Sequence, residues 1–236
     1  MSLRGEAAEG VSGYTKAVTP AAIIFDLDDT LANRAAGLAK YASMLAEDFS
    51  AHLHSCSLSD VHAALLATDD FGSIKQALAL AKSSLWRTAP SEHVLFDHWT
   101  SRFGAAATPF PGAIELLQTM RRLRIKGGLI TNGDSAMQRS KIAALGIEPL
   151  LDVIVISSEV GAQKPESSIF NFALGELGCT AAEAWFVGDH PDQDVRGAAM
   201  AGLRAFWVPT GSARDSNPPG TQLNSLEDLQ GYLRPL

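Results

Sequence analysis

Short runs of apolar residues recur along the chain and predict the strands of a buried β-sheet. Near-continuous apolar runs are typical of parallel strands covered on both faces, whereas a half-exposed strand would alternate apolar and polar residues. The five predicted strands occupy residues 21–26, 127–131, 153–157, 184–187 and 204–208.

Helical patterns separate the last four of these strands. Residues 135–145, 166–177 and 192–201 carry apolar positions at helical spacing, and each segment is followed by a glycine, which readily ends a helix. Strands that alternate with helices of this length predict βαβ units with right-handed crossovers. The sequence therefore predicts an α/β fold, a doubly wound parallel sheet.

The segment between the first and second strands breaks this alternation and shows helical patterns only. Four helices of modest length can bury a common apolar stripe, which predicts a small helical bundle inserted after the first strand. Ser59 and Ser91 are expected to cap the second and fourth of them. The four helices are predicted over residues 35–53, 59–67, 71–87 and 92–103.

These patterns divide the chain into three parts. Residues 1–19 are polar and contain glycine, so we expect a flexible tail. The predicted α/β core comprises residues 20–32 and 109–236, and the predicted helical cap comprises residues 33–108. Further expectations in the core are a helix at 113–123, a mobile loop at 214–220, and a last helix at 226–233 that begins with a capping box of Ser225 and Asp228.

Composition and charge narrow the range of partners. Of the 236 residues, 46% are hydrophobic, and the formal net charge is −7. This acidic balance argues against a nucleic-acid backbone or an anionic membrane surface as the main partner. The chain shows no membrane-spanning apolar run and no secretory signal, so we expect a cytoplasmic protein. Cys56 and Cys179 lack the spacing of zinc ligands. We expect the protein to be a monomer or a homodimer.

Two aspartates stand at the end of the first predicted strand. Asp26 and Asp28 are two residues apart, so on a strand they would share one face at about 6–7 Å, with Asp29 facing away. Two neighbouring carboxylates repel each other unless a cation or hydrogen bonds offset the repulsion. Ligands of open α/β sheets bind at the carboxyl ends of the strands. The pair is therefore a candidate site, although aspartates that merely cap a loop would give the same pattern.

Polar residues follow three further strands in the same position. Thr131 and Asn132 offer groups that bond phosphate oxygens, although Thr-Asn-Gly is also a common turn. Lys164 stands before a proline and either neutralises a phosphate and a carboxylate or lies solvated at the surface. Asp189 offers the hard oxygen ligand that Mg²⁺ prefers. Asp194 either orients a metal-bound water or a ligand, or complements the dipole of the next helix.

Taken together, these segments resemble the motifs of the haloacid dehalogenase superfamily. The resemblance covers essentially residue 21 to the C-terminus, and the helical insertion is similar to the C1-type cap of that superfamily. The motifs look most like those of its small-metabolite phosphatases, the nucleotidase and N-acylneuraminate-9-phosphatase relatives. The matching segments are Asp26-Leu27-Asp28, Thr131-Asn132-Gly133, Lys164-Pro165 and Gly188-Asp189 through Asp194.

The resemblance implies a role for each polar residue. Asp26 would be the nucleophile and would form an aspartyl-phosphate. Asp28 would protonate the leaving oxygen and later deprotonate the attacking water. Thr131, Asn132 and Lys164 would hold the phosphoryl oxygens.

The resemblance also implies a metal cofactor. Mg²⁺ would bind between Asp26, the backbone carbonyl of Asp28, Asp189 and the phosphate, with Asp194 as a further ligand or as a residue behind the ligands. The protein would then be a Mg²⁺-dependent phosphatase that hydrolyses a small phosphorylated metabolite.

Three other functions compete with this interpretation. A 2-haloacid dehalogenase also uses an aspartate nucleophile but generally lacks the second carboxylate, so Asp28 counts against it. A phosphomutase of the same cap class would use the same residues and return the phosphoryl group to a sugar. A receiver-like signalling module also clusters aspartates and a lysine, but receivers are about half this length and have no helical cap.

Overall fold

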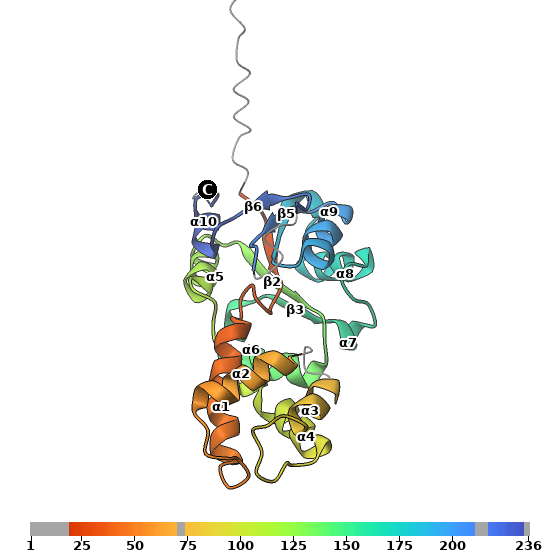
Figure 1. Cartoon of the computed structure of the whole chain (residues 1–236). Helices are drawn as coiled ribbons and strands as arrows, with labels where there is room; N and C mark the ends of the chain where they lie inside the picture. Colours follow the sequence, from red (N-terminus) through yellow and green to blue (C-terminus); the bar gives the residue numbers. More distant parts are fainter. Residues whose placement is uncertain (1–18, 70–73, 211–216, 234–236) are drawn as a thin grey trace, which may run out of the picture.

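The computed structural model describes residues 19–69, 74–210 and 217–233, which form a parallel sheet with an inserted helical bundle (Figure 1). The six strands lie in the order β3-β2-β1-β4-β5-β6, and every neighbouring pair is parallel. The predicted fold class is confirmed. The sixth strand was not predicted, because its two residues carry no apolar pattern. The strands are β1 (Ala22–Phe25), β2 (Lys126–Thr131), β3 (Val153–Ile156), β4 (Ala184–Gly188), β5 (Arg204–Trp207) and β6 (Thr221–Gln222).

Alternate residues of β1 build two hydrophobic layers, one on each face of the sheet. Ile23 and Phe25 belong to the layer that includes α5 (Ala113–Arg122) and α10 (Leu226–Gln230). Ala22 and Ile24 belong to the opposite layer, with α8 (Ser167–Leu177) and α9 (Gly197–Met200); the two helix pairs flank the sheet in Figure 1. Burial of one Ile or Phe side chain contributes about 1.5–3 kcal/mol. This two-sided burial holds the end of β1, and the residues after it, at the centre of the sheet.

The helices that follow the inner strands lie close to their predicted places, with one exception. Helix α6 covers Ser135–Leu145 and α8 ends before Gly178, both as predicted. The expected regular helix at 192–201 begins instead as a π-helix over Pro191–Arg196, followed by α9. This wide turn buries the Asp194 side chain, which accepts a hydrogen bond from the backbone N–H of His190. Short helices elsewhere are α7 (Ser157–Val160), η2 (Glu148–Leu150) and η3 (Ala181–Glu183).

The inserted segment forms a helical bundle with a core of its own. Tyr41 and Trp99 pack edge to face, with ring centroids 4.9 Å apart, inside a cluster of buried Leu, Val and Phe side chains. The capping Ser91 is confirmed, because its side chain accepts a bond from Val94 N. The bundle comprises α1 (Arg34–Asp48), α2 (Leu58–Thr68), α3 (Ile74–Ala81) and α4 (Glu92–Arg102), followed by η1 (Gly104–Ala106).

Two boundaries in the bundle differ from the prediction. Helix α2 is capped by Ser57 and not by Ser59, because Ser57 and Asp60 form a reciprocal capping box. Helix α1 ends at Asp48, five residues earlier than predicted, and α3 ends at Ala81. The predicted start of the third helix, at residue 71, lies outside the described residues.

The chain leaves the sheet and returns to it through adjacent backbone segments. The Asn33 N–H donates to the Thr108 carbonyl at 2.8 Å, and the Phe110 N–H donates to the Leu31 carbonyl at 2.8 Å. The side chain of Asn33 accepts a bond from Ala36 N and so caps α1. These bonds lie at the cap boundaries that we predict, and they hold the two connections together.

Gly104 allows the cap to pack closely on the core at α6. A Cβ at this position would lie 2.4 Å from Ser140 Oγ and 2.5 Å from Ser140 Cβ. We expect Gly104→Ala to destabilise the protein by about 1–3 kcal/mol, because η1 and α6 must separate to admit the methyl group. Urea unfolding measures the change. Adding Ser140→Gly should recover part of the loss, and additive losses in the double variant would contradict this account.

The C-terminal helix is shorter than predicted and begins differently. It covers Leu226–Gln230, and Ser225 makes no side-chain cap bond. The carboxylate of Asp228 instead accepts the N–H of Asn224 at 2.8 Å. The predicted tail, up to residue 18, and the predicted loop, up to residue 216, lie outside the described residues. Within the described ranges, no helix combines the length and the apolar character needed to cross a bilayer.

Candidate active site

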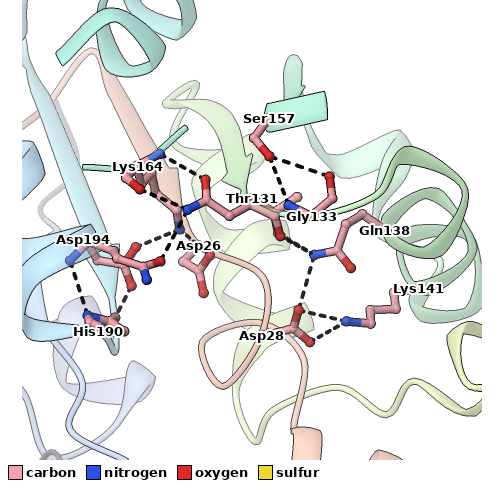
Figure 2. Close-up of polar contacts among 12 residues, drawn as sticks. Asp26, Asp28, Thr131, Gly133, Gln138, Lys141, Ser157, Lys164, His190 and Asp194 are labelled. Carbon is pink, nitrogen blue, oxygen red and sulfur yellow. Dashed lines mark hydrogen bonds and ion pairs between the residues drawn. The ribbon is translucent and has the colours of Figure 1, made fainter. Parts of the chain in front are cut away.

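Asp26 lies directly after β1 and faces a buried lysine (Figure 2). The ammonium of Lys164 contacts Asp26 Oδ1 at 2.5 Å and Asp194 Oδ1 at 2.6 Å. All three side chains are buried, with Lys164 only 4% exposed. The structure therefore brings together three of the predicted site residues from three different strand ends. The surface position considered for Lys164 is excluded.

Negative charge exceeds positive charge in this cluster. Burial raises the pKa of Asp26 well above its usual value, and the charges of Asp194 and Asp189 add to the effect, although Lys164 opposes it. Burial alone would lower the pKa of Lys164, but Asp194 and Asp26 raise it, so the lysine stays protonated. One ammonium thus faces more carboxylate charge than it can neutralise.

Asp189 completes a group of three carboxylates. Oxygens from Asp26, Asp189 and Asp194 lie within 4.8 Å of one another. Burial, together with repulsion by Asp194, raises the pKa of Asp189 to about 7. Thr210 donates a hydrogen bond to Asp189 Oδ2 at 2.7 Å and fixes that side chain. Hard oxygen donors in excess of the local positive charge fit a divalent cation such as Mg²⁺.

Asp28 lies apart from this group, on the side of the cap. Because β1 ends at Phe25, the alternation of a strand does not extend to Asp28, so the strand argument for a shared face does not apply. Its carboxylate contacts the ammonium of Lys141 at 2.7 and 2.8 Å, as Figure 2 shows. Although burial favours the neutral carboxyl, Lys141 and Gln138 lower the pKa of Asp28.

The residues at the end of β2 and after it connect the two groups. Asn132 holds the backbone of Lys164, since its Oδ1 accepts the Lys164 N–H at 2.9 Å and its Nδ2 donates to the Lys164 carbonyl at 3.0 Å. Gln138 donates to Thr131 Oγ1 at 2.5 Å and lies 3.2 Å from Asp28 Oδ2. Thr131 is therefore connected to Asp28 through Gln138. The side chain of Asn132 therefore bonds the backbone of Lys164 at two atoms, a contact that the sequence did not indicate.

Gln138 and Lys141 were missed by the sequence analysis. Both are buried, and they lie on the inward face of α6 with Ile142 and Leu145. Positions 138, 141, 142 and 145 follow the spacing of a buried helical stripe. A glutamine and a lysine within such a stripe were the available signal, because buried lysine is rare without a partner.

Asp29 was expected to face away from Asp26 and Asp28, but it lies close to the site. Its backbone lies in the left-handed region, with φ of 58°, and its carboxylate accepts the N–H of Arg34 at 3.1 Å. Its charge also raises the pKa of Asp189, after the larger effects of burial and of Asp194. Asp29 thus adds to the negative field of the site.

A cavity of about 440 Å³ opens beside Asp28, between the cap and the core. One side of it is apolar, formed by Phe96, Trp99, Phe103 and Met137. The remaining wall is polar and is formed by Asp28, Arg34, Thr100, Asn132, Gly133, Asp134, Gln138 and Lys141.

Curated proteins of similar sequence are named phosphatases or, in one case, a nucleotidase. The chain is 41% identical over 121 residues to the phosphoserine phosphatase of Thermus thermophilus, covering 51% of this chain and 48% of that protein. It is 32% identical over 165 residues to the pyrimidine 5'-nucleotidase YjjG of Escherichia coli, covering 60% and 71% respectively. It is 37% identical to the glyceraldehyde 3-phosphate phosphatase of Methanopyrus kandleri, covering 54% and 58%. For the first and third relatives, the chain thus spans only about half of their length.

Solved structures share the fold over almost the whole chain. The magnesium-bound HAD-hydrolase YfnB from Bacillus subtilis has a TM-score of 0.70 and 21% identity, covering 91% of this chain and 99% of that one. CbbY from Rhodobacter sphaeroides, in complex with phosphate, has a TM-score of 0.60 and 25% identity, covering 89% and 96%. The family model for haloacid dehalogenase-like hydrolases matches residues 23–208, which run from the first strand through the fifth. The chain belongs to the haloacid dehalogenase-like hydrolase family.

Proposed function

We propose that this protein is a Mg²⁺-dependent phosphatase that hydrolyses a small phosphate monoester through an aspartyl-phosphate on Asp26. The observation that carries the proposal is the buried Asp26 carboxylate, which faces the Lys164 ammonium within a group of three carboxylates. A carboxylate nucleophile is useful against an anionic phosphate only where positive charge offsets their repulsion. The phosphatase names of the relatives support the same reaction class.

In the first half of the reaction, an Asp26 oxygen attacks phosphorus and the ester oxygen leaves. The Lys164 ammonium and the Thr131 hydroxyl would hold the phosphoryl oxygens, as positioning and electrostatics supply most of the rate in phosphoryl transfer. Asn132 fixes the backbone of Lys164 and so the direction of its ammonium. The leaving oxygen takes a proton from the Asp28 carboxyl.

In the second half, water attacks phosphorus, inorganic phosphate leaves and Asp26 is regenerated. Asp28 takes the proton of this water, for which the carboxyl must be ionised. Lys141 and Gln138 favour this ionised form, against the effect of burial. When Asp28 is protonated for the first half of the reaction, its ion pair with Lys141 weakens. This contact therefore changes during the catalytic cycle.

Asp26, Asp189 and the backbone carbonyl of Asp28 would hold Mg²⁺, with Asp194 close by. When bound, Mg²⁺ screens the repulsion between the carboxylate and the anionic substrate and polarises the phosphoryl group. The three-carboxylate group supports this assignment because it provides hard oxygen donors.

The reaction is tested by incubating the purified protein with Mg²⁺ and a panel of phosphate monoesters and measuring free phosphate. Sustained release is the expected result. Isomerised sugar phosphate without release would indicate a phosphomutase. Halide release from 2-haloacids would indicate a dehalogenase, which Asp28 disfavours because a halide needs no proton on leaving. Family membership gives no support to the receiver-like alternative.

Mg²⁺ is expected to raise the melting temperature by about 5 °C at saturation and pH 8, since binding to the native state alone stabilises it. The shift should be smaller at pH 6. In the metal-free protein, the Asp189 pKa of about 7 lies above the usual value of 3.8, so a proton occupies this carboxyl below pH 7 and competes with the cation. The proton on Asp189 stabilises the metal-free fold, and this stabilising effect is lost as the pH rises through 7. Asp189→Asn should remove most of the Mg²⁺ shift, and an equal shift in this variant would contradict the metal assignment.

A further inference from the structure

We infer that the cavity between α4 and α6 binds the leaving group of the substrate, and that it selects a neutral leaving group about the size of a nucleoside. This inference rests on the phosphatase function proposed above and names its substrate class. Three features of the cavity carry it: its position, its size and the balance of charge on its walls.

The position follows from two residues shared with the catalytic group. Asp28, the proposed proton donor to the leaving oxygen, lines the cavity. Asn132 also lines it and bonds the backbone of Lys164, whose ammonium contacts Asp26. Because the leaving oxygen must lie within hydrogen-bond reach of Asp28, the group attached to that oxygen extends into the cavity.

The size favours a leaving group larger than a triose. The cavity encloses about 440 Å³, within the range of about 300–1,000 Å³ for sites of drug-sized ligands. At about 30 Å³ for each non-hydrogen atom, the share of one water molecule in the liquid, a leaving group of six such atoms occupies at most about 180 Å³, because bonded atoms pack more closely than separate molecules. The same arithmetic gives room for at least about 15 non-hydrogen atoms, which is enough to place a ribose that carries a pyrimidine ring.

The apolar wall of the cavity offers an aromatic surface to the leaving group. Trp99 and Phe103 are already stacked on each other, with centroids 3.9 Å apart and planes at 15°. Phe96, one turn earlier on α4, is half-buried and has no aromatic partner within the described chain. A planar ring in the substrate would supply that partner, and stacking on an aromatic side chain favours flat, weakly polar groups.

The charged residues of the cavity balance one another before catalysis begins, which favours binding of a neutral leaving group. In this resting state, Lys141 pairs with the ionised Asp28. Arg34 pairs with Asp69, and Asp134 accepts the N–H of Met137 at the start of α6. A carboxylate or a second phosphate on the leaving group would have to displace one of these contacts. It would gain no net attraction in return.

The test compares two primary alkyl phosphates, uridine 5'-monophosphate and glycerol 3-phosphate, in the Mg²⁺-loaded protein. Their reacting centres are alike, so the ratio of their kcat/KM values reports the leaving group alone. The wild-type ratio should favour uridine 5'-monophosphate by at least about tenfold. O-phosphoserine, whose leaving group is charged, should rank with glycerol 3-phosphate. Phe96→Ala should lower the ratio about tenfold, the scale of one base-stacking contact.

A matched control and a general substrate separate the possible failures. Val94 is exposed on α4, so Val94→Ala should leave the ratio unchanged. Preference of the wild type for glycerol 3-phosphate or O-phosphoserine, or an equal loss for both esters in Phe96→Ala, would overturn the inference while leaving the phosphatase proposal intact. Absence of phosphate release from every ester, including p-nitrophenyl phosphate, would overturn the phosphatase proposal and the inference together.

Discussion

Replacing Asp26 with asparagine is expected to lower the rate of phosphate release by at least about 10⁴-fold, because an amide oxygen cannot form the aspartyl-phosphate. The fold should survive. Asparagine has nearly the same shape, and Lys164 keeps its contact with Asp194 at 2.6 Å. Removing one of three crowded carboxylates also relieves the repulsion that, after burial, raises the pKa of Asp26. Rates of phosphate release and thermal unfolding of the same samples measure both effects.

Asp192→Asn is the matched control for this prediction. Asp192 lies in the acidic segment that also holds Asp189 and Asp194, but its side chain is exposed and pairs with Arg196. This variant should keep the rate within about twofold, because exposed ion pairs contribute little. If Asp26→Asn turned over at the wild-type rate, Asp26 would not be the nucleophile.

Replacing Lys164 with methionine is expected to destabilise the protein by about 3–5 kcal/mol, because two buried carboxylates lose their shared counter-charge. Asp26 and Asp194 both contact this ammonium, and all three side chains are buried. Activity should fall as well, because Lys164 is the only cationic side chain that contacts Asp26 among the described residues. Urea unfolding gives the free energy, and phosphate release gives the rate.

A double variant separates the charge effect from a packing effect. Lys164→Met combined with Asp194→Asn removes one of the unpaired carboxylates and should recover part of the lost stability. Lys40→Met serves as the control, since Lys40 is exposed and only donates to the Ala105 carbonyl at 3.3 Å. A loss below about 0.5 kcal/mol in Lys164→Met, typical of surface substitutions, would contradict the proposed electrostatic role.

Most of the fold was predictable because its strands are buried on both faces. All four residues of β1 are buried, so the strand appears in the sequence as a continuous apolar run. Such a run distinguishes the strand from a loop. Strand β6 lacks such a run, since Thr221 and Gln222 lie at the edge of the sheet. The cap of α2 was misplaced by two residues because Ser57 and Ser59 are both suitable caps, and only the position of Asp60 selects Ser57.

The site was predictable where strand ends position the residues, and less so where side chains reach from helices. Asp26, Lys164 and Asp194 meet because parallel strands bring their carboxyl ends to one edge. The orientation of Asp28 depends on Lys141, which lies 113 residues away in the sequence. No local pattern encodes such a contact. The buried polar stripe on α6 indicates that partners exist but not which they are.

An aspartyl-phosphate can be trapped by quenching the Mg²⁺-loaded protein with acid during turnover, and the modified peptides can be mapped by mass spectrometry. The proposed nucleophilic role of Asp26 predicts the mass of one phosphoryl group on the peptide that contains Asp26, lost on treatment with base and absent from Asp26→Asn. A phosphoryl group on another residue, or an unmodified Asp26 peptide throughout rapid turnover, would contradict it.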